Sequence, residues 1–384
     1  MAHPVDSQPI ATAGRVVIIG SGLLGTSIAL LLRAKNVEVY LEDASPVSLA
    51  LACDLGGGQA AAKYAGDSDW HQSIALAVIA VPPDVTAPVT IDALKRFPNA
   101  VVTDVASVKT PILNAVLAAD VDHHRYVPSH PMAGRERSGA SAADQDLFRS
   151  RPWVVINHPK ASKHALLTVR DLALDCGASV VNLDATEHDR AVAIVSHVPQ
   201  LVSSLLAARL VEAPEEALGL IGQGLRDTTR IANSDPRLWN SIICGNRGPI
   251  SSVLTAFAKD LSDLLSGLTV ATDSDFGEAI ATPGCVGAVN SAMQAGNEGA
   301  ARIPGKHGGA PRRWSVVAVL VPDKPGELGR LFTDLGAVGI NIEDFSMDHS
   351  AYQRVGTAYL SVDPAQAAEA EGELAQRGWR IVKQ

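Results

Sequence analysis

The 384-residue sequence has few cysteines and no excess of basic residues, and each absence excludes a class of protein. The four cysteines are scattered singly, without the paired spacing of a zinc site or the density of a disulfide-linked secreted domain. We therefore expect free thiols in a reducing compartment and no bound metal. A net charge of −9 disfavours nucleic acid or an anionic membrane as a partner.

The sequence also lacks the features of a targeted or membrane-spanning protein. Residues 1–13 contain no basic segment followed by an apolar one, as a signal peptide requires, and they are typical of a disordered tail. No apolar run reaches the roughly 18 residues that cross a bilayer. The sequence therefore predicts a cytoplasmic protein, and its length predicts two or three domains.

The stretch Arg15–Arg33 predicts a dinucleotide-binding site. Its apolar run Val16–Ile19 is typical of a buried parallel strand, and the pattern Gly-x-Gly-x-x-Gly follows directly. The three glycines are Gly20, Gly22 and Gly25. In this pattern the first permits a tight turn, the second lets the backbone approach a pyrophosphate, and the third lets the helix lie close to the strand. The helix that begins near Leu23 presents unpaired N–H groups to the phosphates.

An acidic residue after the second predicted strand indicates which dinucleotide binds. The strand spans Val37–Leu41, and Asp43 lies 18 residues past Gly25, close to the spacing of a ribose-binding carboxylate. Such a carboxylate repels a 2′-phosphate, and residues 44–46 supply no lysine or arginine to bind one. The sequence therefore favours NAD over NADP. Glu42 is the alternative for this role, because strand alternation alone does not separate the two acids.

The first two predicted domains differ in their hydrophobic pattern. Residues 14–184 alternate short strands with helical segments, which predicts a Rossmann-type, doubly wound α/β domain. The later strands expected there are Ile74–Val81, Ala100–Asp104, Tyr126–Ser129, Trp153–Ile156 and Val180–Leu183. Residues 185–290 predict an all-helical domain whose apolar positions suit mutual packing or a dimer interface. Its clearest helices are His188–Val211, Pro236–Cys244 and Pro249–Leu268.

The C-terminal third has a different composition. Residues 291–312 are rich in Gly, Ala and Pro, which predicts a linker. Residues 313–384 then predict the order βαββαβ, typical of a ferredoxin-like α+β domain. The expected elements are strand Trp314–Val321, helix Gly326–Val338, strands Ile340–Met347 and Arg354–Val362, helix Pro364–Arg377 and strand Trp379–Val382.

Two polar stretches at predicted strand ends hold candidate catalytic residues. Ser107 follows the strand Ala100–Asp104 and would lie near the cofactor crevice, although capping of the next helix is the alternative. His130 lies in a loop marked by proline and glycine, and loops held by a scaffold commonly carry reactive groups. Histidine is the usual general base near neutral pH. A surface or hydrogen-bonded histidine is the alternative for His130.

Two further polar positions fall in the predicted helical domain. His197 lies inside an apolar helix, and Pro199 would loosen the turn before it and free a carbonyl group. A hydrogen-bonded core histidine is the alternative. Arg230 lies in a polar segment, residues 226–236, and arginine suits two-point binding of a carboxylate. A loop with surface ion pairs is the alternative for this segment.

Five motifs in order resemble one enzyme family. They are GSGLLGTS, TDVASVK, PSHPMAG, VSHVPQ and LRDTTRIANSDPRLW. Together they resemble the prephenate/arogenate dehydrogenase family over residues 14–285, and the family fold is a Rossmann domain followed by a helical dimerisation domain. The C-terminal region resembles an ACT domain through Asp323, Pro325–Leu328 and Gly339–Ile342.

The resemblance implies oxidative decarboxylation of a cyclohexadienyl acid with NAD as cofactor. His130 matches the family base, which deprotonates the ring hydroxyl of the substrate. Ser107 matches the serine that helps to orient that histidine and the nicotinamide. His197 and Arg230 match the residues that hold the substrate, with Arg230 as its carboxylate anchor.

Three functions are open at this point. A prephenate dehydrogenase would yield 4-hydroxyphenylpyruvate in tyrosine biosynthesis, and an arogenate dehydrogenase would yield tyrosine directly. An acidic residue placed for the ammonium group would favour arogenate. The third is a non-catalytic sensor of dinucleotide and amino acid, which the presence of His130 and Arg230 disfavours. Arg135, where many relatives carry threonine, and Gln200, where some carry histidine, depart from the family pattern.

The C-terminal resemblance also implies regulation. ACT domains generally pair and bind amino acids at their interface, which points to Asp323, Gly326 and Asn341 in this chain. Tyrosine, the end product of the pathway, is the expected effector, with phenylalanine second. We therefore expect a small-molecule substrate, an amino-acid effector and a homodimer, and neither a nucleic acid nor a membrane as partner.

Overall fold

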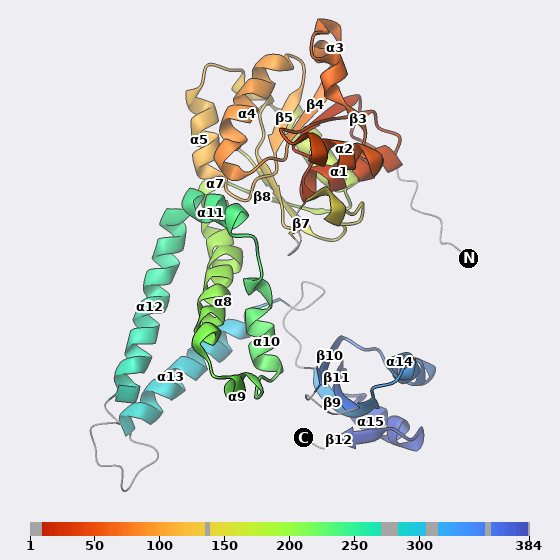
Figure 1. The fold of residues 1–384 in the computed structure, drawn as a ribbon, viewed down its shortest axis with the longest axis vertical. Coiled ribbons are helices and arrows are strands. Elements are labelled where there is room, and N and C mark those ends of the chain that lie inside the picture. The colour runs from red at the N-terminus through yellow and green to blue at the C-terminus, as the bar shows by residue number, and fades with distance from the viewer. Residues whose placement is uncertain (1–9, 135–138, 270–282, 305–313, 350–354, 383–384) are drawn as a thin grey trace. The chain divides into compact units, whose positions relative to one another are not determined.

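The computed structural model describes residues 10–134, 139–269, 283–304, 314–349 and 355–382 (Figure 1). The chain divides into two compact units. The first comprises the chain up to Leu205 together with Ile231–Ala256, and the second comprises Leu206–Arg230 together with the chain from Phe257 onward.

A five-stranded parallel sheet forms the frame of the first unit. Its strand order is β3-β2-β1-β4-β5. The strands are β1 (Arg15–Ile19), β2 (Val39–Glu42), β3 (Gln59–Ala60), β4 (Ile74–Ile79) and β5 (Val101–Asp104). Four of them were predicted from their apolar runs, whereas β3 has only two residues and no apolar run to mark it. The central strand β1 is buried almost throughout, as a sheet covered on both faces requires.

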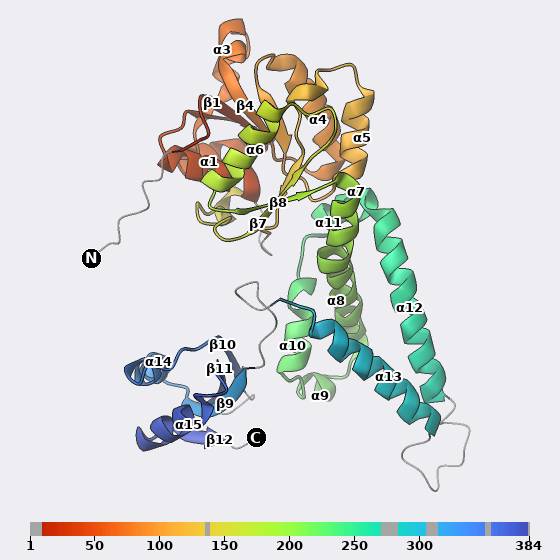
Figure 2. The same cartoon turned by 180° about the vertical axis from the view of Figure 1, so that it is seen from behind.

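Helices cover both faces of this sheet (Figures 1 and 2). The helices α1 (Leu23–Ala34) and α6 (Lys163–Asp175) contribute to the core on one face. The helices α4 (Pro83–Arg96) and α5 (Thr110–Ala118) contribute to the core on the other. Shorter helices are α2 (Pro46–Asp54), η1 (Ala61–Tyr64) and α3 (Ser68–Ser73). The predicted Rossmann-type arrangement is confirmed.

A three-stranded sheet completes the α/β part, in the order β6-β7-β8. Its strands are β6 (Ser129–Pro131), β7 (Pro152–Ile156) and β8 (Ser179–Leu183). The strand predicted over Tyr126–Ser129 is wrong in position, because Tyr126 bridges Val102 of the larger sheet before the chain crosses to β7. His130, expected in a loop, therefore lies within β6.

The helical part of the first unit begins with a continuous run that changes its winding. It consists of α7 (Ala185–Val192), the π-helix η4 (Ala193–His197) and α8 (Val198–Ala208), whose residues from Leu206 onward belong to the second unit. Proline at position 199 has no N–H for the usual bond to the fourth residue before it, and the predicted loosening of the preceding turn appears as the π-helix. The helices α11 (Pro236–Gly245) and α12 (Arg247–Thr269) follow further along the chain.

The run Ala185–Glu212 is long and apolar enough, by length and composition, to cross a membrane, which the sequence had not suggested. Core helices of soluble proteins share these properties, and 33% of its most apolar window is buried inside the structure. The run also carries the buried polar residues His188, Asp189 and His197, which connect it to the rest of the first unit.

The second unit contains helices and a separate sheet. Its helical elements are the end of α8, η5 (Arg209–Glu212), α9 (Glu215–Leu218), α10 (Gln223–Thr229), the start of η6 (Arg230–Ala232), the later part of α12, and α13 (Pro283–Ala300). The linker predicted over 291–312 is wrong up to Ala300, because α13 continues to that residue. The close packing of α13 on α12 lies before this stretch: a Cβ atom added at Gly267 would lie 2.3 Å from Cβ of Ala288, whereas residues 291–300 are exposed.

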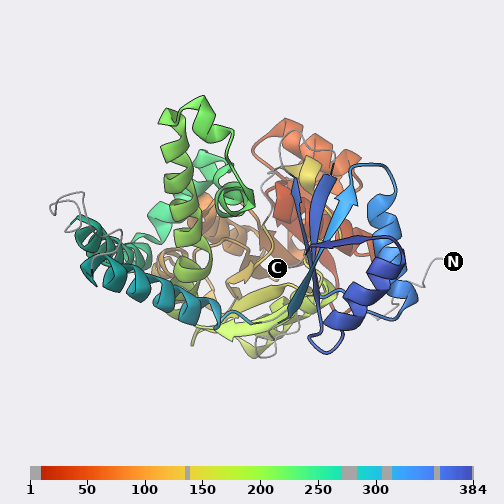
Figure 3. The ribbon, with the colours of Figure 1, turned by 90° about the horizontal axis from the view of Figure 1, so that it is seen from below.

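The C-terminal segment has the predicted βαββαβ order. Its elements are β9 (Ser315–Pro322), α14 (Glu327–Ala337), β10 (Asp344–His349), β11 (Val355–Val362), α15 (Ala367–Gln376) and β12 (Arg380–Val382). The four strands form an antiparallel sheet in the order β10-β11-β9-β12, drawn in blue in Figure 3. Leu331 and Leu335 of α14 and Leu374 of α15 pack in one core with the sheet.

Part of the predicted N-terminal tail is held in place. The backbone N–H groups of Ala11 and Thr12 donate to the carboxylate of Asp175 at 3.1 and 2.7 Å, and the Thr12 hydroxyl adds a bond of 2.6 Å. The prediction of a disordered tail is therefore wrong for these two residues, which sequence pattern could not connect to a carboxylate more than 160 positions away.

The glycine turn after β1 yields a test of the fold. A Cβ atom added at Gly25 would lie 1.9 Å from the carbonyl oxygen of Gly20, whereas one added at Gly22 would meet nothing within 4 Å. We expect Gly25→Ala to lower the free energy of unfolding by about 3 kcal/mol or more, because α1 must move off β1. Gly22→Ala should cost less than about 1 kcal/mol. Denaturant unfolding of the two variants measures this, and equal losses would contradict the close packing.

Candidate active site

The loop after β1 has the geometry that a dinucleotide site requires. Gly20 adopts φ +108°, and a Cβ atom there would lie 2.3 Å from the carbonyl oxygen of Ala80, so only glycine fits. Gly22 is the N-cap of α1, which begins at Leu23, and open space surrounds it. The turn thus brings a helix N-terminus to the carboxyl edge of the sheet, where ligands of such sheets bind.

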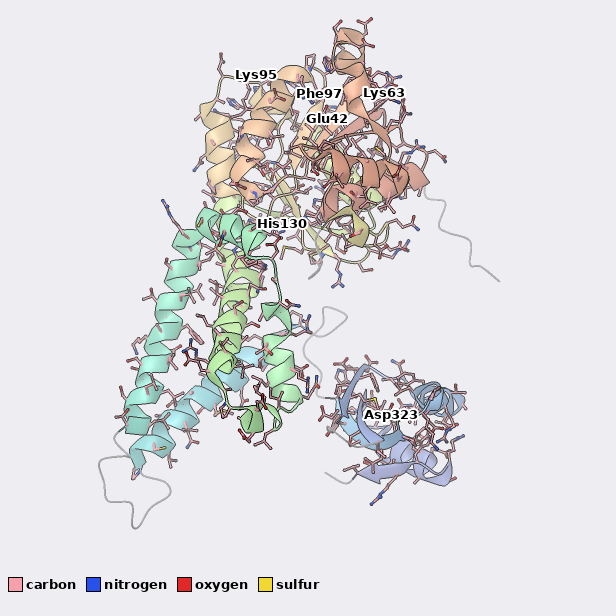
Figure 4. All side chains as sticks on the ribbon, in the orientation of Figure 1. Glu42, Lys63, Lys95, Phe97, His130 and Asp323 are labelled. Atoms are coloured by element: carbon pink, nitrogen blue, oxygen red, sulfur yellow. The ribbon has the colours of Figure 1, made fainter. Side chains whose placement is uncertain are left out.

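The two candidate ribose acids have different surroundings. The carboxylate of Asp43 accepts hydrogen bonds from the N–H groups of Ser21 and Ser45 at 2.5 and 2.7 Å, which holds it beside the glycine turn. Glu42, labelled in Figure 4, instead accepts from Nη2 of Arg96 at 2.6 and 2.5 Å. The ion pair occupies the Glu42 carboxylate, so Asp43 is the better placed of the two acids.

A chain of three buried side chains ends at His130, which Figure 4 labels where the strands meet the helices of the first unit. Nδ1 of His130 lies 2.9 Å from Nε2 of His188, and Nδ1 of His188 lies 2.8 Å from Oδ1 of Asp189. The Asp189 carboxylate also accepts from the backbone N–H groups of Lys109 and Thr110 at 2.9 and 2.8 Å. The chain therefore joins β6, α7 and the start of α5.

The direction of these hydrogen bonds follows from the groups at the end of the chain. An ionised carboxylate only accepts, so His188 must donate to Asp189 through Nδ1. Neutral His188 then carries a lone pair on Nε2, and His130 must donate to it through Nδ1. Neutral His130 is left with its lone pair on Nε2, the form that a general base requires. Nε2 of His130 has no hydrogen-bond partner within the described residues.

The electrostatic environment keeps the two imidazoles neutral. Burial, followed by the nearby His188 and Lys109, lowers the pKa of His130 well below its usual value. Burial also lowers the pKa of His188, although the hydrogen bond to Asp189 opposes this. For Asp189, burial raises the pKa, but the hydrogen bonds from His188, Thr110 and Lys109 outweigh it and the net shift is downward. The hydrogen-bonded series therefore consists of the Asp189 carboxylate followed by the neutral imidazoles of His188 and His130.

A fully buried ion pair between Lys109 and Asp104 supports the strand residue that precedes His130. Nζ of Lys109 forms a hydrogen bond with Oδ1 of Asp104 and another, of 2.7 Å, with the carbonyl oxygen of Ser129. The hydroxyl of Tyr126 donates to the second oxygen of Asp104 at 2.7 Å. Lys109 thus holds Ser129, next to His130, through its side chain, and Asp189 through its backbone.

Ser107 is half-buried in the turn between β5 and α5. The N-cap of α5 is Lys109, so Ser107 does not cap this helix, which was the alternative to a site role. No hydrogen bond joins Ser107 to His130 within the described residues, and the orienting bond comes from His188. The orienting role expected for Ser107 stays a prediction.

His197 ends the π-helix and is buried. Its Nδ1 lies 3.1 Å from Nδ2 of Asn246, and its ring meets that of Trp239 edge to face at a centroid distance of 6.1 Å. Gln200 is also buried, and its side-chain amide donates to the carbonyl oxygen of Ile231 at 2.9 Å. Gln200 therefore fixes the segment that follows α10.

The remaining candidates lie in the second unit or outside the described residues. Arg230 begins η6 with an exposed side chain, and its role as carboxylate anchor stays a prediction. Asp323 is exposed (Figure 4), Gly326 precedes α14 with φ +91°, and the Asn341 amide donates to Glu343 at 2.7 Å. Their regulatory role is likewise a prediction. Arg135 lies outside the described residues.

Sequence reasoning missed most of the residues that support His130. His188 and Asp189 follow the capping box of Asp184 and Glu187 at the start of α7, where they look like ordinary first-turn polar residues. Lys109 is the last residue of the motif TDVASVK, from which only Ser107 was chosen as a candidate. The one available signal was the run of four ionisable residues, Glu187–Arg190, at the start of a helical run that is otherwise largely apolar.

Fold and site together define a Rossmann-type dinucleotide-dependent oxidoreductase with a helical second domain. Residues 28–182 match the nucleotide-binding domain of prephenate dehydrogenase, and residues 184–280 match the prephenate dehydrogenase dimerization domain. The chain belongs to the prephenate dehydrogenase family.

Individual relatives agree with this assignment. The chain is 36% identical over 366 residues to a protein of Streptomyces niveus named probable prephenate dehydrogenase, covering 94% of this chain and 98% of the relative. It is 28% identical over 274 residues to the cyclohexadienyl dehydrogenase of Zymomonas mobilis, covering 68% and 90%. The crystal structure of Aquifex aeolicus prephenate dehydrogenase in complex with hydroxyphenyl propionate and NAD⁺ superposes with a TM-score of 0.63 at 26% identity, covering 74% and 98%.

The buried neutral histidines predict how stability depends on pH. The pKa values of His130, His158, His188 and His197 are all lowered in the folded chain, so the unfolded chain binds more protons below pH 6.5. The stability that these neutral rings contribute is complete above pH 6.5 and is lost as the pH falls through their lowered pKa values. The slope is at most about 5.4 kcal/mol per pH unit for four protons.

Denaturant unfolding between pH 5 and 6.5 measures this slope. His197→Gln should reduce it, because one buried imidazole is removed. His124→Gln, at an exposed position, is the matched control and should leave it unchanged. An identical slope in wild type and His197→Gln would contradict the assignment of His197 as a neutral buried ring.

Proposed function

We propose that the protein is an NAD-dependent prephenate dehydrogenase, which converts prephenate to 4-hydroxyphenylpyruvate and CO₂ in tyrosine biosynthesis. The observation that carries the proposal is the chain from Asp189 through His188 to His130, which leaves a neutral imidazole with its lone pair on Nε2. The family assignment and the glycine turn supply the context for this base.

The residues of this chain perform the proton transfers. Nε2 of His130 takes the proton of the ring hydroxyl while the hydrogen on the same carbon leaves as hydride, and the carbon becomes a carbonyl. The bond from the ring to the carboxylate then breaks, CO₂ leaves, and its electron pair makes the ring aromatic, with the charge on the former carbonyl oxygen. The His130 imidazolium returns the proton to that oxygen. Bound NAD supplies the hydride acceptor at nicotinamide C4.

The loop geometry supports NAD as the dinucleotide. Gly25 allows α1 to lie against the glycine turn, and the space at Gly22 leaves room for a pyrophosphate at the helix N-terminus. Asp43, held at the turn by Ser21, would accept hydrogen bonds from a ribose diol and repel a 2′-phosphate.

Two buried carboxylates near His130 bear on the choice between prephenate and arogenate. Asp189 accepts from His188, Lys109 and Thr110, and Asp104 is bonded to Lys109 and Tyr126. Both carboxylates therefore serve to hold the site together. Prephenate is the proposed substrate, with arogenate as the alternative that the assay below decides.

The remaining roles complete the proposal. Ser107 would contribute to orienting the nicotinamide, and His197 and Arg230 would hold the substrate, with Arg230 on a carboxylate. We further propose that the chain forms a homodimer through its helical domain, since that segment matches a dimerization domain. The cytoplasm is the proposed location, as for a soluble biosynthetic enzyme.

The C-terminal domain is proposed to be regulatory and of the ACT type. Its βαββαβ order and antiparallel sheet support a ferredoxin-like fold. Asp323, Gly326 and Asn341 flank α14 and would contribute to a tyrosine site. Regulation then requires tyrosine to bind two states of the enzyme with different affinities.

The first test measures NADH formation with prephenate and arogenate in parallel, each with NAD and with NADP. We expect turnover of prephenate with NAD, and a loss of about 10²–10⁴-fold in kcat for His130→Asn with little change in dinucleotide binding. His124→Asn, at an exposed position, serves as the control. Preference for arogenate would replace the proposed substrate. No turnover of either would favour the non-catalytic sensor.

The second test concerns tyrosine. A chain that ends at Ala310 should keep its activity and lose inhibition by tyrosine, and Asn341→Ala in the full chain should weaken that inhibition. NADH formation is measured against tyrosine and, separately, phenylalanine. Equal inhibition of the shortened and full-length enzymes would place the tyrosine site in the catalytic part and would contradict a regulatory C-terminal domain.

A further inference from the structure

Asn246 connects the two histidines that the proposed function uses. It lies between α11 and α12, and it is buried. Its Nδ2 lies 2.7 Å from the carbonyl oxygen of Asp189 and 3.1 Å from Nδ1 of His197. Asp189 therefore has two roles. Its side chain orients His130 through His188, and its main-chain carbonyl binds the Asn246 amide that holds His197.

The chemistry of these contacts fixes the position of the protons. A carbonyl oxygen can only accept, so the Asn246 atom that faces Asp189 must be the amide nitrogen. That nitrogen has a second proton, which it donates to His197. Nδ1 of His197 must therefore accept, and the proton of the neutral ring lies on Nε2.

His197 is neutral near pH 7. Burial, followed by the neighbouring His188, lowers the pKa of His197 to about 4, and Asp189 opposes this only in part. His130, on β6, is the other titratable group that interacts with the ring. The ring is thus held as one tautomer rather than as an imidazolium.

We propose that Asn246 is a positioning residue that holds His197 as a hydrogen-bond donor through Nε2, so that His197 selects a substrate group that accepts. The inference rests on the proposed function, in which His197 contacts the substrate. A keto or carboxylate oxygen fits such a donor, whereas an ammonium group does not. The two rings then have complementary roles, because His130 presents a lone pair at Nε2 and His197 presents a proton.

The test replaces Asn246 with its isosteric acid in the full chain. In Asn246→Asp a carboxylate faces Nδ1 of His197 and draws the ring proton to that atom, so Nε2 becomes an acceptor. We expect KM for prephenate to rise roughly 5- to 100-fold, with a smaller change in kcat, because a buried substrate oxygen loses its donor. Nitrogen-15 NMR of His197 should show an unprotonated Nδ1 in the wild type and a protonated Nδ1 in the variant.

A second buried amide provides the matched control. Gln200→Glu makes the same amide-to-carboxylate change on α8, where the partners of the amide are Ile231, Ser204 and Ser234. It should leave the NMR signature of His197 unchanged. A double-mutant cycle with His197→Gln then isolates the pair: if Asn246 acts through His197, Asn246→Asp should add little to KM in that background.

The outcomes separate this inference from the proposed function. The NMR measurement on the wild type requires no turnover, so it decides the tautomer even if neither prephenate nor arogenate is a substrate or if Asn246→Asp fails to fold. A wild-type His197 protonated on Nδ1 overturns the inference. An equal rise in KM with and without His197 also overturns it, because Asn246 would then act by another route.

Discussion

The buried carboxylate of Asp189 is the constraint on which the rest of the site depends. A carboxylate removed from water without partners costs several kcal/mol, so its hydrogen bonds are a condition for folding as well as for function. The partners come from a β–α turn and from a neighbouring ring, and each bond to an ionised group contributes about 1.5–3 kcal/mol. The carboxylate of Asp189 thus joins α7 to the start of α5.

Lys109 extends this constraint to His130, at the other end of the hydrogen-bonded series. Its backbone binds Asp189, while its ammonium group, buried with Asp104, reaches the residue before His130. The orientation of the base and the position of the carboxylate that orients it are therefore not independent. A positive charge close to His130 also keeps that imidazole neutral, which a base must be before it can act.

The sequence predicted those features that are encoded locally. The glycine turn, the apolar strands and the βαββαβ order follow from spacing and periodicity over a few residues. The support for His130 comes from His188, 58 positions away, and no local pattern indicates that β6 and α7 meet. Composition misled over residues 291–300, where small residues that suggested a linker instead continue the helix α13 with exposed side chains. The anchoring of Thr12 by Asp175 is likewise a distant contact.

The candidate site shows the same division. His130 was predicted because a reactive residue type stood in a conspicuous motif, although its strand was misplaced by three residues. Asp43 could be named but not separated from Glu42 until Arg96 was seen to bind the latter. Asn246 had no signal at all, because an asparagine between two helices is an ordinary helix end in any sequence.

The π-helix between α7 and α8 has a consequence for the angular phase of the whole run. His188 and His197 are nine residues apart, which is two and a half turns of a regular α-helix and would direct the two rings to opposite faces. A π turn takes in an extra residue and shifts the phase of everything after it. It thereby acts like a one-residue insertion that rotates His197 toward the face of His188. His197 is then joined, through the single amide of Asn246, to the main-chain carbonyl of the residue that follows His188.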